Sequence, residues 1–339
     1  MDIVRWGLLS TANINKKLIP AIRESARGEL TAVASRTERR ARTYARQWKI
    51  PNWFGSYRDM LESGEVDAIY LSLPNHLHAE WTIQALESGM HVLCEKPLAL
   101  TLEEVDAMFT ASREQELVLA EAFMYRHHPQ TKLVGEWVRS GKLGQLSMVR
   151  GAFDFFLPLQ QRQAKNLNVR LKPEYGGGSL WDVGVYPLSF AQYVLGKAPD
   201  RVFGLQRVGE TGVDEYFAGQ MIYRLPGGAE AAAQISSSFQ TPYHTFFEIV
   251  GEEGRLHLNR PFTNLNRGRK LTYTTPKGKT RTLKVPRKEL YLGEVEDMHA
   301  AILDGRSPYL KPEESRDHIR TVLALYRSAC TGAVVELNA

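Results

Sequence analysis

The feature that most constrains the fold of this chain is a regular alternation of short apolar segments and amphipathic helical patterns over residues 1–122. The apolar segments predict buried strands at residues 3–9, 30–35, 68–73, 91–94 and 117–121. Because strands that alternate with helices require right-handed crossovers, we expect a doubly wound parallel sheet of the Rossmann type. Such a sheet binds ligands at the carboxyl ends of its strands.

The pattern changes after residue 122. A strand is expected at 146–156, and apolar segments separated by Gly, Pro and Asn turns, among them 230–238, follow one another from residue 201 to about 285. Helical patterns close the chain at 289–303 and 313–330. Consecutive strands with short turns predict an α+β domain with a large, mainly antiparallel, open-faced sheet. We therefore expect a dinucleotide-binding domain over residues 1–122 and a substrate-binding and oligomerisation domain over residues 123–339.

One expected strand, at residues 216–223, carries apolar side chains that would point to both faces of this sheet. A second apolar face is stable only when another subunit or another part of the chain shields it from water. We expect a homodimer or homotetramer formed through the sheet, and the alternative is a face that is covered within the chain.

Composition narrows the class of protein. The 339 residues are 43% hydrophobic, but no apolar run is long enough to cross a membrane, and the N-terminus shows no export signal. Cys94 and Cys330 make no disulfide framework, which favours the cytoplasm.

The net charge of +5 raises the question of a nucleic-acid partner. Basic residues concentrate at 36–46, in a predicted helix, and at 266–288, where they alternate as on the solvent face of a sheet. There is no zinc-finger spacing and no aromatic RNA-binding signature, so we expect no nucleic-acid partner.

The first strand-to-helix turn is where a Rossmann domain holds a dinucleotide pyrophosphate. The usual G-x-G-x-x-G is absent, and the turn reads Ser10, Thr11, Ala12, Asn13 and Ile14. Ser10 and Ala12 are small enough for close backbone approach, while Thr11 and Asn13 offer hydrogen-bond donors. This turn is the expected pyrophosphate site.

The end of the second strand indicates which dinucleotide binds. NAD sites usually place an acidic residue there, whereas a 2′-phosphate is bound by hydroxyl and guanidinium groups. Here Ser35, Arg36 and Arg40 are present and the acidic residue is missing, so we expect a preference for NADP(H), with NAD(H) possible. A solvated helix face is the alternative explanation for Arg42 and Arg46.

The third strand ends at Leu73, Pro74 and Asn75, followed by His78, and these residues are expected to line the cofactor crevice. Asn75 can cap the next helix or contact a ribose. His76 and His78 lack a further ligand at metal-binding spacing, so no metal is expected, and His78 is interpreted as a packed or cofactor-edge residue.

The next strand delivers Glu95 and Lys96 to the same edge. A lysine is rarely buried unless it is paired, so Lys96 beside Glu95 is a candidate for contact with cofactor and substrate, and a surface lysine is the alternative.

The second domain carries a glycine-rich segment from 176 to 187 that contains Asp182 and Tyr186. Residues four apart on a helix share a face, so these two side chains are expected to project together. Gly184 and Pro187 are poor helix formers, and broken local preferences are typical of functional sites. A buried tyrosine that only hydrogen-bonds a buried aspartate is the alternative.

Four motifs in this order resemble the family of glucose-fructose oxidoreductase, inositol dehydrogenase and MocA. They are Glu95-Lys96-Pro97, Leu73-Pro74-Asn75 with His78, the run from Gly176 to Tyr186, and the segment 121–129 that contains Phe123 and Arg126. The resemblance covers nearly the whole chain and is nearest to the branch of dihydrodiol dehydrogenase and NADP-dependent D-xylose dehydrogenase. The altered glycine loop departs from the usual family pattern.

The resemblance implies an NADP(H)-dependent oxidoreductase that acts on a sugar or polyol. Alcohol oxidation needs a base and a stabiliser for the developing alkoxide, which assigns Tyr186 as acid/base, Lys96 as cationic stabiliser and Asp182 as hydrogen-bond partner. Lys96 could instead accept the proton. The family also implies a cis peptide before Pro97.

Further candidates are Arg126 for the cofactor, and Phe123 and Arg170 for the substrate; ordinary ion pairs are the alternative for both arginines. The expected reaction is oxidation of an aldose such as D-xylose or D-glucose at C1, with ketosugar reduction or trans-dihydrodiol oxidation as alternatives. The alternative from another class is a non-catalytic dinucleotide-binding regulator.

Overall fold

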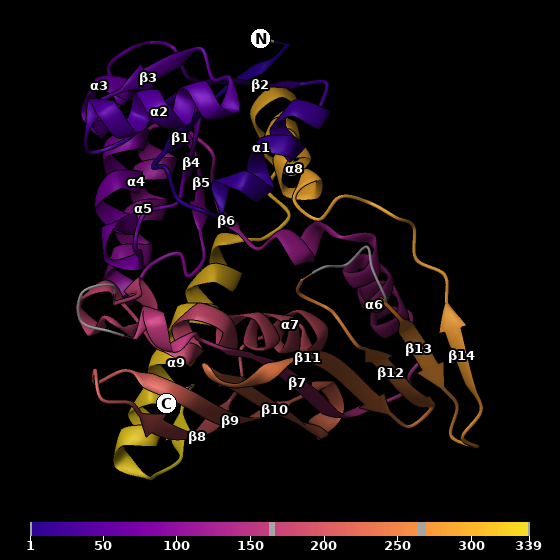
Figure 1. Ribbon diagram of the computed structural model, residues 1–339. Helices are drawn as coiled ribbons and strands as arrows, with labels where there is room; N and C mark the ends of the chain where they lie inside the picture. Colours follow the sequence, from indigo (N-terminus) through magenta and orange to yellow (C-terminus); the bar gives the residue numbers. More distant parts are fainter. Residues whose placement is uncertain (1, 163–166, 264–268, 338–339) are drawn as a thin grey trace. The chain divides into compact units, whose positions relative to one another are not determined.

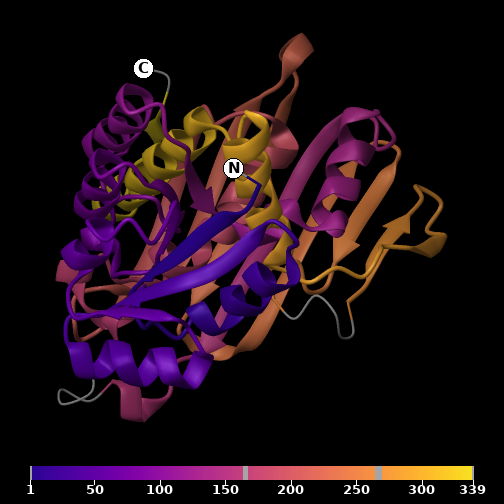
Figure 2. The ribbon, with the colours of Figure 1, turned by 90° about the horizontal axis from the view of Figure 1, so that it is seen from above.

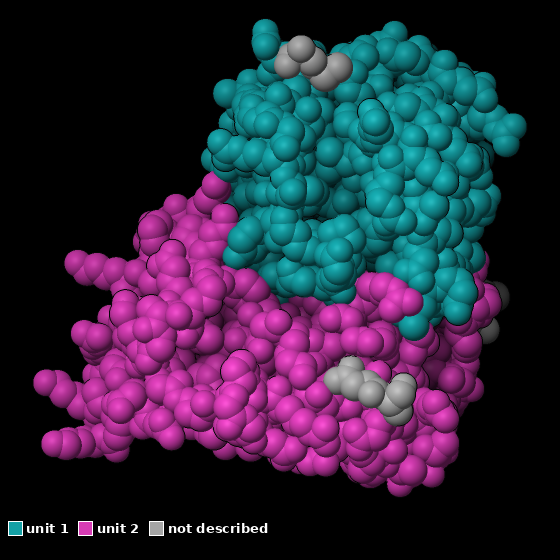
Figure 3. Space-filling view, turned by 180° about the vertical axis from the view of Figure 1, so that it is seen from behind, with its two compact units in different colours: residues 1–127, 289–315 teal, residues 128–288, 316–339 magenta. Residues whose placement is uncertain are grey.

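The structure is a computed structural model that describes residues 2–162, 167–263 and 269–337. The chain forms two compact units, Met1–His127 with Glu289–Ser315, and His128–Lys288 with Arg316–Ala339 (Figure 3). Residues 266–268 of the basic stretch lie outside the described residues. Each unit is built on one sheet.

The first unit contains a six-stranded sheet in the order β3-β2-β1-β4-β5-β6, and its neighbouring strands are all parallel. The strands are β1 (Val4–Leu9), β2 (Gly28–Ala34), β3 (Asn52–Phe54), β4 (Ala68–Leu71), β5 (His91–Glu95) and β6 (Leu119–Ala122). The expected doubly wound sheet is confirmed. Strand order reverses between β1 and β4, which is the point where such sheets bind dinucleotides.

Helices flank this sheet, as Figures 1 and 2 show from two directions. They are α1 (Asn15–Glu24), α2 (Glu38–Trp48), α3 (Tyr57–Leu61), α4 (His78–Glu87), α5 (Leu102–Glu114) and α8 (Leu292–Asp304), with 3-10 turns η1 (Asn75–Leu77) and η2 (Met124–His127). Helix α4 packs against α5, and α8 packs against α1. The start of α5 is fixed by a capping box between Thr101 and Glu104.

The first unit differs from the expected domain in one respect, because it takes back the distant segment Glu289–Ser315. The indole of Trp6 in β1 donates a 2.8 Å hydrogen bond to Nε2 of His299 in α8. Arg27 forms an ion pair with Asp304 at 2.7 Å. The sequence pattern assigned these residues to the second domain because a strand run leads directly into them.

The second unit contains a nine-stranded sheet in the order β14-β13-β12-β11-β7-β10-β9-β8-β15. Its neighbours are antiparallel except for the parallel pair of β7 and β10, so the mainly antiparallel sheet is confirmed. The strands are β7 (Leu146–Phe156), β8 (Arg201–Val208), β9 (Asp214–Arg224), β10 (Glu230–Ser238), β11 (Gln240–Gly251), β12 (Gly254–Leu258), β13 (Leu271–Thr274), β14 (Thr280–Leu283) and β15 (Val335–Glu336).

Helices cover one face of this sheet. They are α6 (Pro129–Arg139), the π-helical turn η7 (Leu180–Gly184), α7 (Val185–Leu195) and α9 (Pro312–Thr331), with 3-10 turns η3 (Leu159–Gln161), η5 (Val169–Leu171), η6 (Pro173–Tyr175) and η8 (Pro226–Gly228). Helix α7 lies along β7 and β10 (Figure 1). Phe190 of α7 stacks on Phe247 of β11 with ring centroids 4.0 Å apart, and both rings are fully buried.

Alternate residues of the same strands point away from this covered face. In β9, Phe217 and Met221 are fully buried, whereas Tyr216 and Ile222 on the other face are only half-buried. The apolar character of both faces of this strand is confirmed.

Two further sequence predictions concern membranes and cysteines. Within the described part of the chain, no helix has the length and apolar character needed to span a bilayer. Cys94 is buried and Cys330 is exposed, and both are free.

Candidate active site

The turn after β1 is held in shape by a buried network of small polar side chains. The hydroxyl of Ser10 lies 2.7 Å from that of Ser72, which donates to Oδ1 of Asn15 at 2.7 Å. Asn15 in turn donates to the Ser10 carbonyl at 2.8 Å. The network fixes the turn without the usual glycines.

The turn itself presents backbone to solvent. Thr11, Ala12 and Ile14 are half-buried and Asn13 is exposed, and α1 begins after Ile14 with no side-chain cap. The N–H groups of Asn15, Lys16 and Lys17 donate to carbonyls of the same turn, and the positive end of a helix favours an anion at this place. This geometry fits a pyrophosphate.

The end of β2 places two cations at the same edge of the sheet. Ser35 is buried, and its N–H donates to the carbonyl of Phe54 at 3.1 Å. Arg36 and Arg40 are exposed, and neither guanidinium group has an ion pair or hydrogen bond among the described residues. Two such guanidinium groups beside a serine fit a phosphate monoester.

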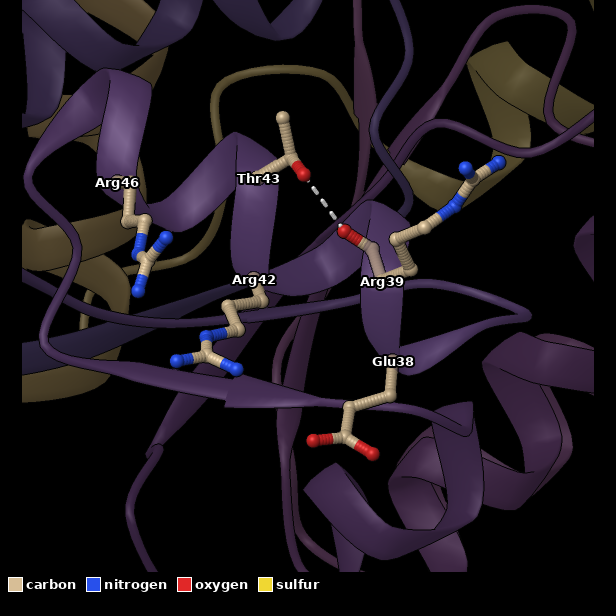
Figure 4. Close-up of a pocket in the computed structure, with 5 residues that line it drawn as sticks. All are labelled: Glu38, Arg39, Arg42, Thr43 and Arg46. Carbon is tan, nitrogen blue, oxygen red and sulfur yellow. Dashed lines mark hydrogen bonds between the residues drawn. The ribbon is translucent and has the colours of Figure 1, made fainter.

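The other arginines of α2 line a different surface. A hollow of about 440 Å³ is lined by Glu38, Arg39, Arg42, Thr43 and Arg46, whose side chains are drawn in Figure 4. One helix supplies all of these residues, and Arg42 lies over the ring of Trp53 at 6.0 Å. This arrangement agrees with the solvated helix face that was the alternative for Arg42 and Arg46.

His78 joins two segments of the crevice edge. The imidazole is fully buried, with Nε2 2.9 Å from the Leu73 carbonyl and Nδ1 2.9 Å from the Pro97 carbonyl. Burial lowers the pKa of His78, although both carbonyl partners favour the cation. His78 is therefore a packed residue that links Leu73 to Pro97, while Pro74 and Asn75 beside it are half-buried.

Glu95 and Lys96 stand at the carboxyl end of β5, and both are half-buried. The Lys96–Pro97 peptide is cis, as the family resemblance implied. The hydroxyl of Tyr70 donates to Oε1 of Glu95. The next turn is fixed by Glu121, whose carboxylate accepts a 2.9 Å hydrogen bond from the N–H of Leu98.

Phe123 and Arg126 follow β6 and lie in the core of the first unit. Phe123 is 1% exposed and packs edge-on against Tyr125. Arg126 is also 1% exposed; it pairs with Glu314 at 2.7 Å and lies over the ring of Tyr309. In this structure Arg126 therefore forms an ordinary ion pair, which was the alternative to a contact with the cofactor.

Asp182 and Tyr186 lie on the continuous helical segment of η7 and α7 in the second unit. Asp182 is half-buried in the π-helical turn. Tyr186 is 7% exposed, and its ring packs against both Phe153 and Phe262 with centroids 5.5 Å away, while those two rings stack on each other at 5.9 Å. A π-helical turn within an α-helix is frequent at functional sites, and a weak helix former at Gly184 is consistent with it.

Arg170 reaches Asp182 because of the glycines that separate them. Its Nε donates to Oδ2 of Asp182 at 2.5 Å. A Cβ at Gly177 would lie 2.6 Å from the Arg170 carbonyl, so only glycine lets the loop lie this close to the helix start. Charge attraction to Asp182 raises the pKa of Arg170 against the opposing effect of burial, and Tyr186 raises it further. Arg170 and Asp182 therefore form an ion pair near Tyr186.

Several residues near these groups were not predicted from the sequence. Burial raises the pKa values of Tyr70, Tyr291 and Glu294, and the charge of Glu95 raises each of them further. Glu294 falls within the apolar stripe of α8 that contains Val295 and Met298, and a carboxyl in such a stripe is a usable sequence signal.

The described residues include no group of three or more His, Cys, Asp or Glu side chains that could hold a metal ion. The first unit thus offers an anion-binding turn, two exposed guanidinium groups and a lysine at the carboxyl edge of a parallel sheet. The second unit offers a tyrosine beside an arginine–aspartate pair. These groups have the chemistry to bind a dinucleotide and to exchange a proton with an alcohol.

Comparison with known proteins supports this chemistry. Residues 4–123 match the GFO_IDH_MocA model, described as an oxidoreductase family with an NAD-binding Rossmann fold. Residues 131–257 match the model of the C-terminal domain of the same family.

Individual relatives are similar over almost their full length. The chain is 39% identical to D-xylose 1-dehydrogenase (NADP(+)) 2 of Haloferax volcanii, covering 98% of this chain and 99% of that protein. It superposes with a TM-score of 0.86 and 28% identity on KijD10, a 3-ketoreductase from Actinomadura kijaniata in complex with NADP and TDP-benzene, covering 96% and 98% of the two chains. The fold also matches aldose-aldose oxidoreductase from Caulobacter crescentus, with a TM-score of 0.88, 24% identity and coverage of 98% and 99%.

Proposed function

Because the chain belongs to the GFO/IDH/MocA family of oxidoreductases, we propose that it transfers hydride between NADP(H) and a sugar, in the direction of aldose oxidation at C1. The observation that carries this proposal is the full-length similarity to an NADP-dependent D-xylose 1-dehydrogenase. D-Xylose and D-glucose are the proposed substrates. The choice of these two sugars rests on the similarity to the Haloferax volcanii enzyme, and the residues of this chain are compatible with it.

The cofactor preference is supported by the first unit. Arg36 and Arg40 are unpaired among the described residues and stand beside Ser35, where a 2′-phosphate would be held. The turn from Ser10 to Ile14 would hold the pyrophosphate. Leu73, Pro74, Asn75, His78 and Glu95 complete the proposed cofactor set, whereas Arg126 is held in its ion pair with Glu314. When bound, the nicotinamide supplies the hydride acceptor.

Three residues are proposed to act on the sugar. Tyr186 takes the proton from the C1 hydroxyl as the C1 hydride leaves, which converts the cyclic aldose into a lactone. The ammonium of Lys96 stabilises the oxygen on which negative charge develops, and Tyr186 acts as the base in its ionised form. Asp182, held by Arg170, orients a substrate hydroxyl. Phe123 is buried in the core of its unit, so it supports the segment around the site.

A reductive direction is the second candidate, and one specific observation favours it. The similar structure of KijD10 is that of a 3-ketoreductase. Microscopic reversibility lets the same lysine and tyrosine protonate the product of ketone reduction. Oxidation of a trans-dihydrodiol is a third reaction of the same type, named for a mouse relative that is 28% identical.

We propose a homodimer or homotetramer through the open face of the nine-stranded sheet, and a cytoplasmic location in keeping with two free cysteines. A non-catalytic regulator remains the rival from another class.

The first test is the near-ultraviolet absorbance of reduced nicotinamide after mixing the protein with NADP or NAD and a panel of aldoses, polyols and dihydrodiols. We expect sugar-dependent reduction that is faster with NADP. Lys96→Ala and Tyr186→Phe should each lower kcat by about 10²- to 10⁴-fold, the usual contribution of a proton-transfer group.

Lys172→Ala is the matched control, because Lys172 is a half-buried cation on the same loop as Arg170 and has no assigned role. Tight NADP binding without turnover on any sugar or ketosugar would favour the regulator. Turnover that survives in Tyr186→Phe would contradict the assigned base.

A further inference from the structure

A buried carboxylate stands at the start of the helix that carries Asp182 and Tyr186. Asp214, the first residue of β9, is 3% exposed. Its Oδ2 accepts hydrogen bonds from the hydroxyl of Ser179 at 2.7 Å and the N–H of Leu180 at 2.9 Å. Its Oδ1 accepts one from the hydroxyl of Tyr326 in α9 at 2.6 Å. The first turn of η7 is thereby bonded to a strand and to a second helix.

No cationic side chain pairs with Asp214 among the described residues. Burial raises the pKa of this carboxyl, and the three hydrogen bonds oppose that effect. A buried carboxylate is costly unless donors surround it, and the positive end of a helix also stabilises it. An apolar contact at this place would avoid the cost of burying a charge. What the carboxylate adds is a fixed orientation of the three groups that donate to it.

The surroundings leave the first turn little room to rotate. Ser179 is fully buried, and its hydroxyl also lies 3.0 Å from that of Ser237 in β10. Gly178 has φ +123°, and a Cβ there would lie 2.1 Å from Oδ1 of Asp214. The N–H of Asp182 donates to the Gly178 carbonyl at 3.0 Å. The proposed substrate-orienting aspartate therefore belongs to the same turn that Asp214 holds.

We propose that Asp214 is a positioning residue that fixes the rotation of the first turn of η7, and with it the directions of Asp182 and Tyr186. The inference rests on the proposed function, since it assigns Asp214 a part in the same reaction. Asp214 does not touch the substrate. Its effect passes through Ser179 and Leu180 to the helix.

The test compares Asp214→Ala with Asp214→Asn. The alanine variant leaves the N–H of Leu180 and the hydroxyl of Tyr326 without this acceptor and Ser179 with Ser237 alone. We expect kcat to fall about 10- to 100-fold, the cost of a small misplacement of catalytic groups. The KM for NADP should stay unchanged, because the cofactor residues lie in the first unit. The asparagine variant keeps the shape and an acceptor oxygen, so it should recover most of the lost kcat.

Asp200→Ala is the matched control. Asp200 is also buried in the second unit, accepting from the N–H of Arg224 at 2.7 Å and from Lys197 at 2.9 Å. Arg224 is the last residue of β9, at the opposite end of this strand from Asp214. Asp200→Ala should lower Tm comparably and leave kcat near the wild-type value. If Asp214→Ala does not fold, Tyr326→Phe removes one donor and keeps the ring, and a several-fold loss of kcat is expected.

Hydrogen exchange of a peptide covering residues 178–186 distinguishes failure of the positioning role from failure of the proposed function. Faster exchange in Asp214→Ala, but not in Asp200→Ala, together with the selective loss of kcat, supports the proposal. Exchange or kcat at wild-type values in Asp214→Ala overturns the positioning role while the proposed function stands. A wild-type protein that turns over no sugar overturns the proposed function and the positioning role with it, whatever the exchange shows.

Discussion

Among the individual side chains, Glu294 is a buried acid whose ionisation affects stability. It is 2% exposed, and neither carboxyl oxygen has a hydrogen-bond partner among the described residues. Burial, followed by the charges of Glu95, Glu289 and Asp297, raises its pKa well above the ordinary value of 4.5. Glu294 is therefore a neutral acid in the folded protein over a pH range in which the unfolded chain ionises it.

This pKa shift fixes the sign of a pH effect. The stabilising contribution of the neutral acid is complete below about pH 4.5 and is lost as the pH rises toward the folded pKa, because ionisation then favours the unfolded chain. Glu294→Gln cannot ionise, so it should raise the free energy of unfolding by about 1 to 3 kcal/mol at pH 8 and change it little at pH 4. Urea unfolding at both pH values measures this difference.

Glu296→Gln is the control for this measurement, because Glu296 is exposed on the same helix. It should show almost no dependence of the stability change on pH. Equal gains for Glu294→Gln at pH 4 and pH 8 would contradict a raised pKa.

Among the secondary-structure elements, the turn into η7 depends strongly on glycine. Gly178→Ala would combine backbone strain at φ +123° with a 2.1 Å approach to Asp214. We expect a loss of more than about 3 kcal/mol of unfolding free energy in denaturant titration. Gly196 at the end of α7 has φ +76°, and a Cβ there would meet nothing within 4 Å, so Gly196→Ala should cost only about 1 to 2 kcal/mol. Equal losses would show that the collision is absent.

Long elements with a strong pattern were predicted well. The expected strands at 146–156 and 230–238 coincide with β7 and β10, since apolar alternation and flanking turns define both. The short edge strands β3 and β15 were not predicted, because their pairing is decided by the neighbouring strand and leaves little trace in a few residues.

The site was predicted in part for the same physical reason. Strand ends and turns are local, so the positions of Arg36, Lys96 and Asp182 at element ends followed from the sequence. The pairing of Arg170 with Asp182 depends on a loop that folds back across a glycine turn. The role of Asp214 depends on a contact between a strand and a helix far apart in sequence, which no local pattern encodes.

For the molecule as a whole, we expect subunits to associate through the open face of the nine-stranded sheet. Phe203 and Leu205 on β8 are 42% and 61% exposed, and Tyr216 and Ile222 lie on the same face. Leu205→Asp should weaken an interface on this face, because it places a charge in apolar contact. Light scattering after size exclusion should show a smaller mass at low protein concentration.

Ile3→Asp is the control, because Ile3 is a similarly exposed residue of the first unit. It should leave the mass unchanged. A wild-type protein that is monomeric at micromolar concentration, or a Leu205→Asp variant that keeps the wild-type mass, would contradict assembly through this face.

The return of α8 to the first unit has a consequence for biosynthesis. Trp6 contacts His299 and Arg27 contacts Asp304, so these contacts of the first strands form only after much later residues have been synthesised. Until the segment Glu289–Ser315 leaves the ribosome, β1 and α1 lack the helix that packs on them. The nucleotide-binding half therefore completes its folding after the sheet that follows it has been synthesised, and chaperone contact during synthesis should centre on the surface around Trp6.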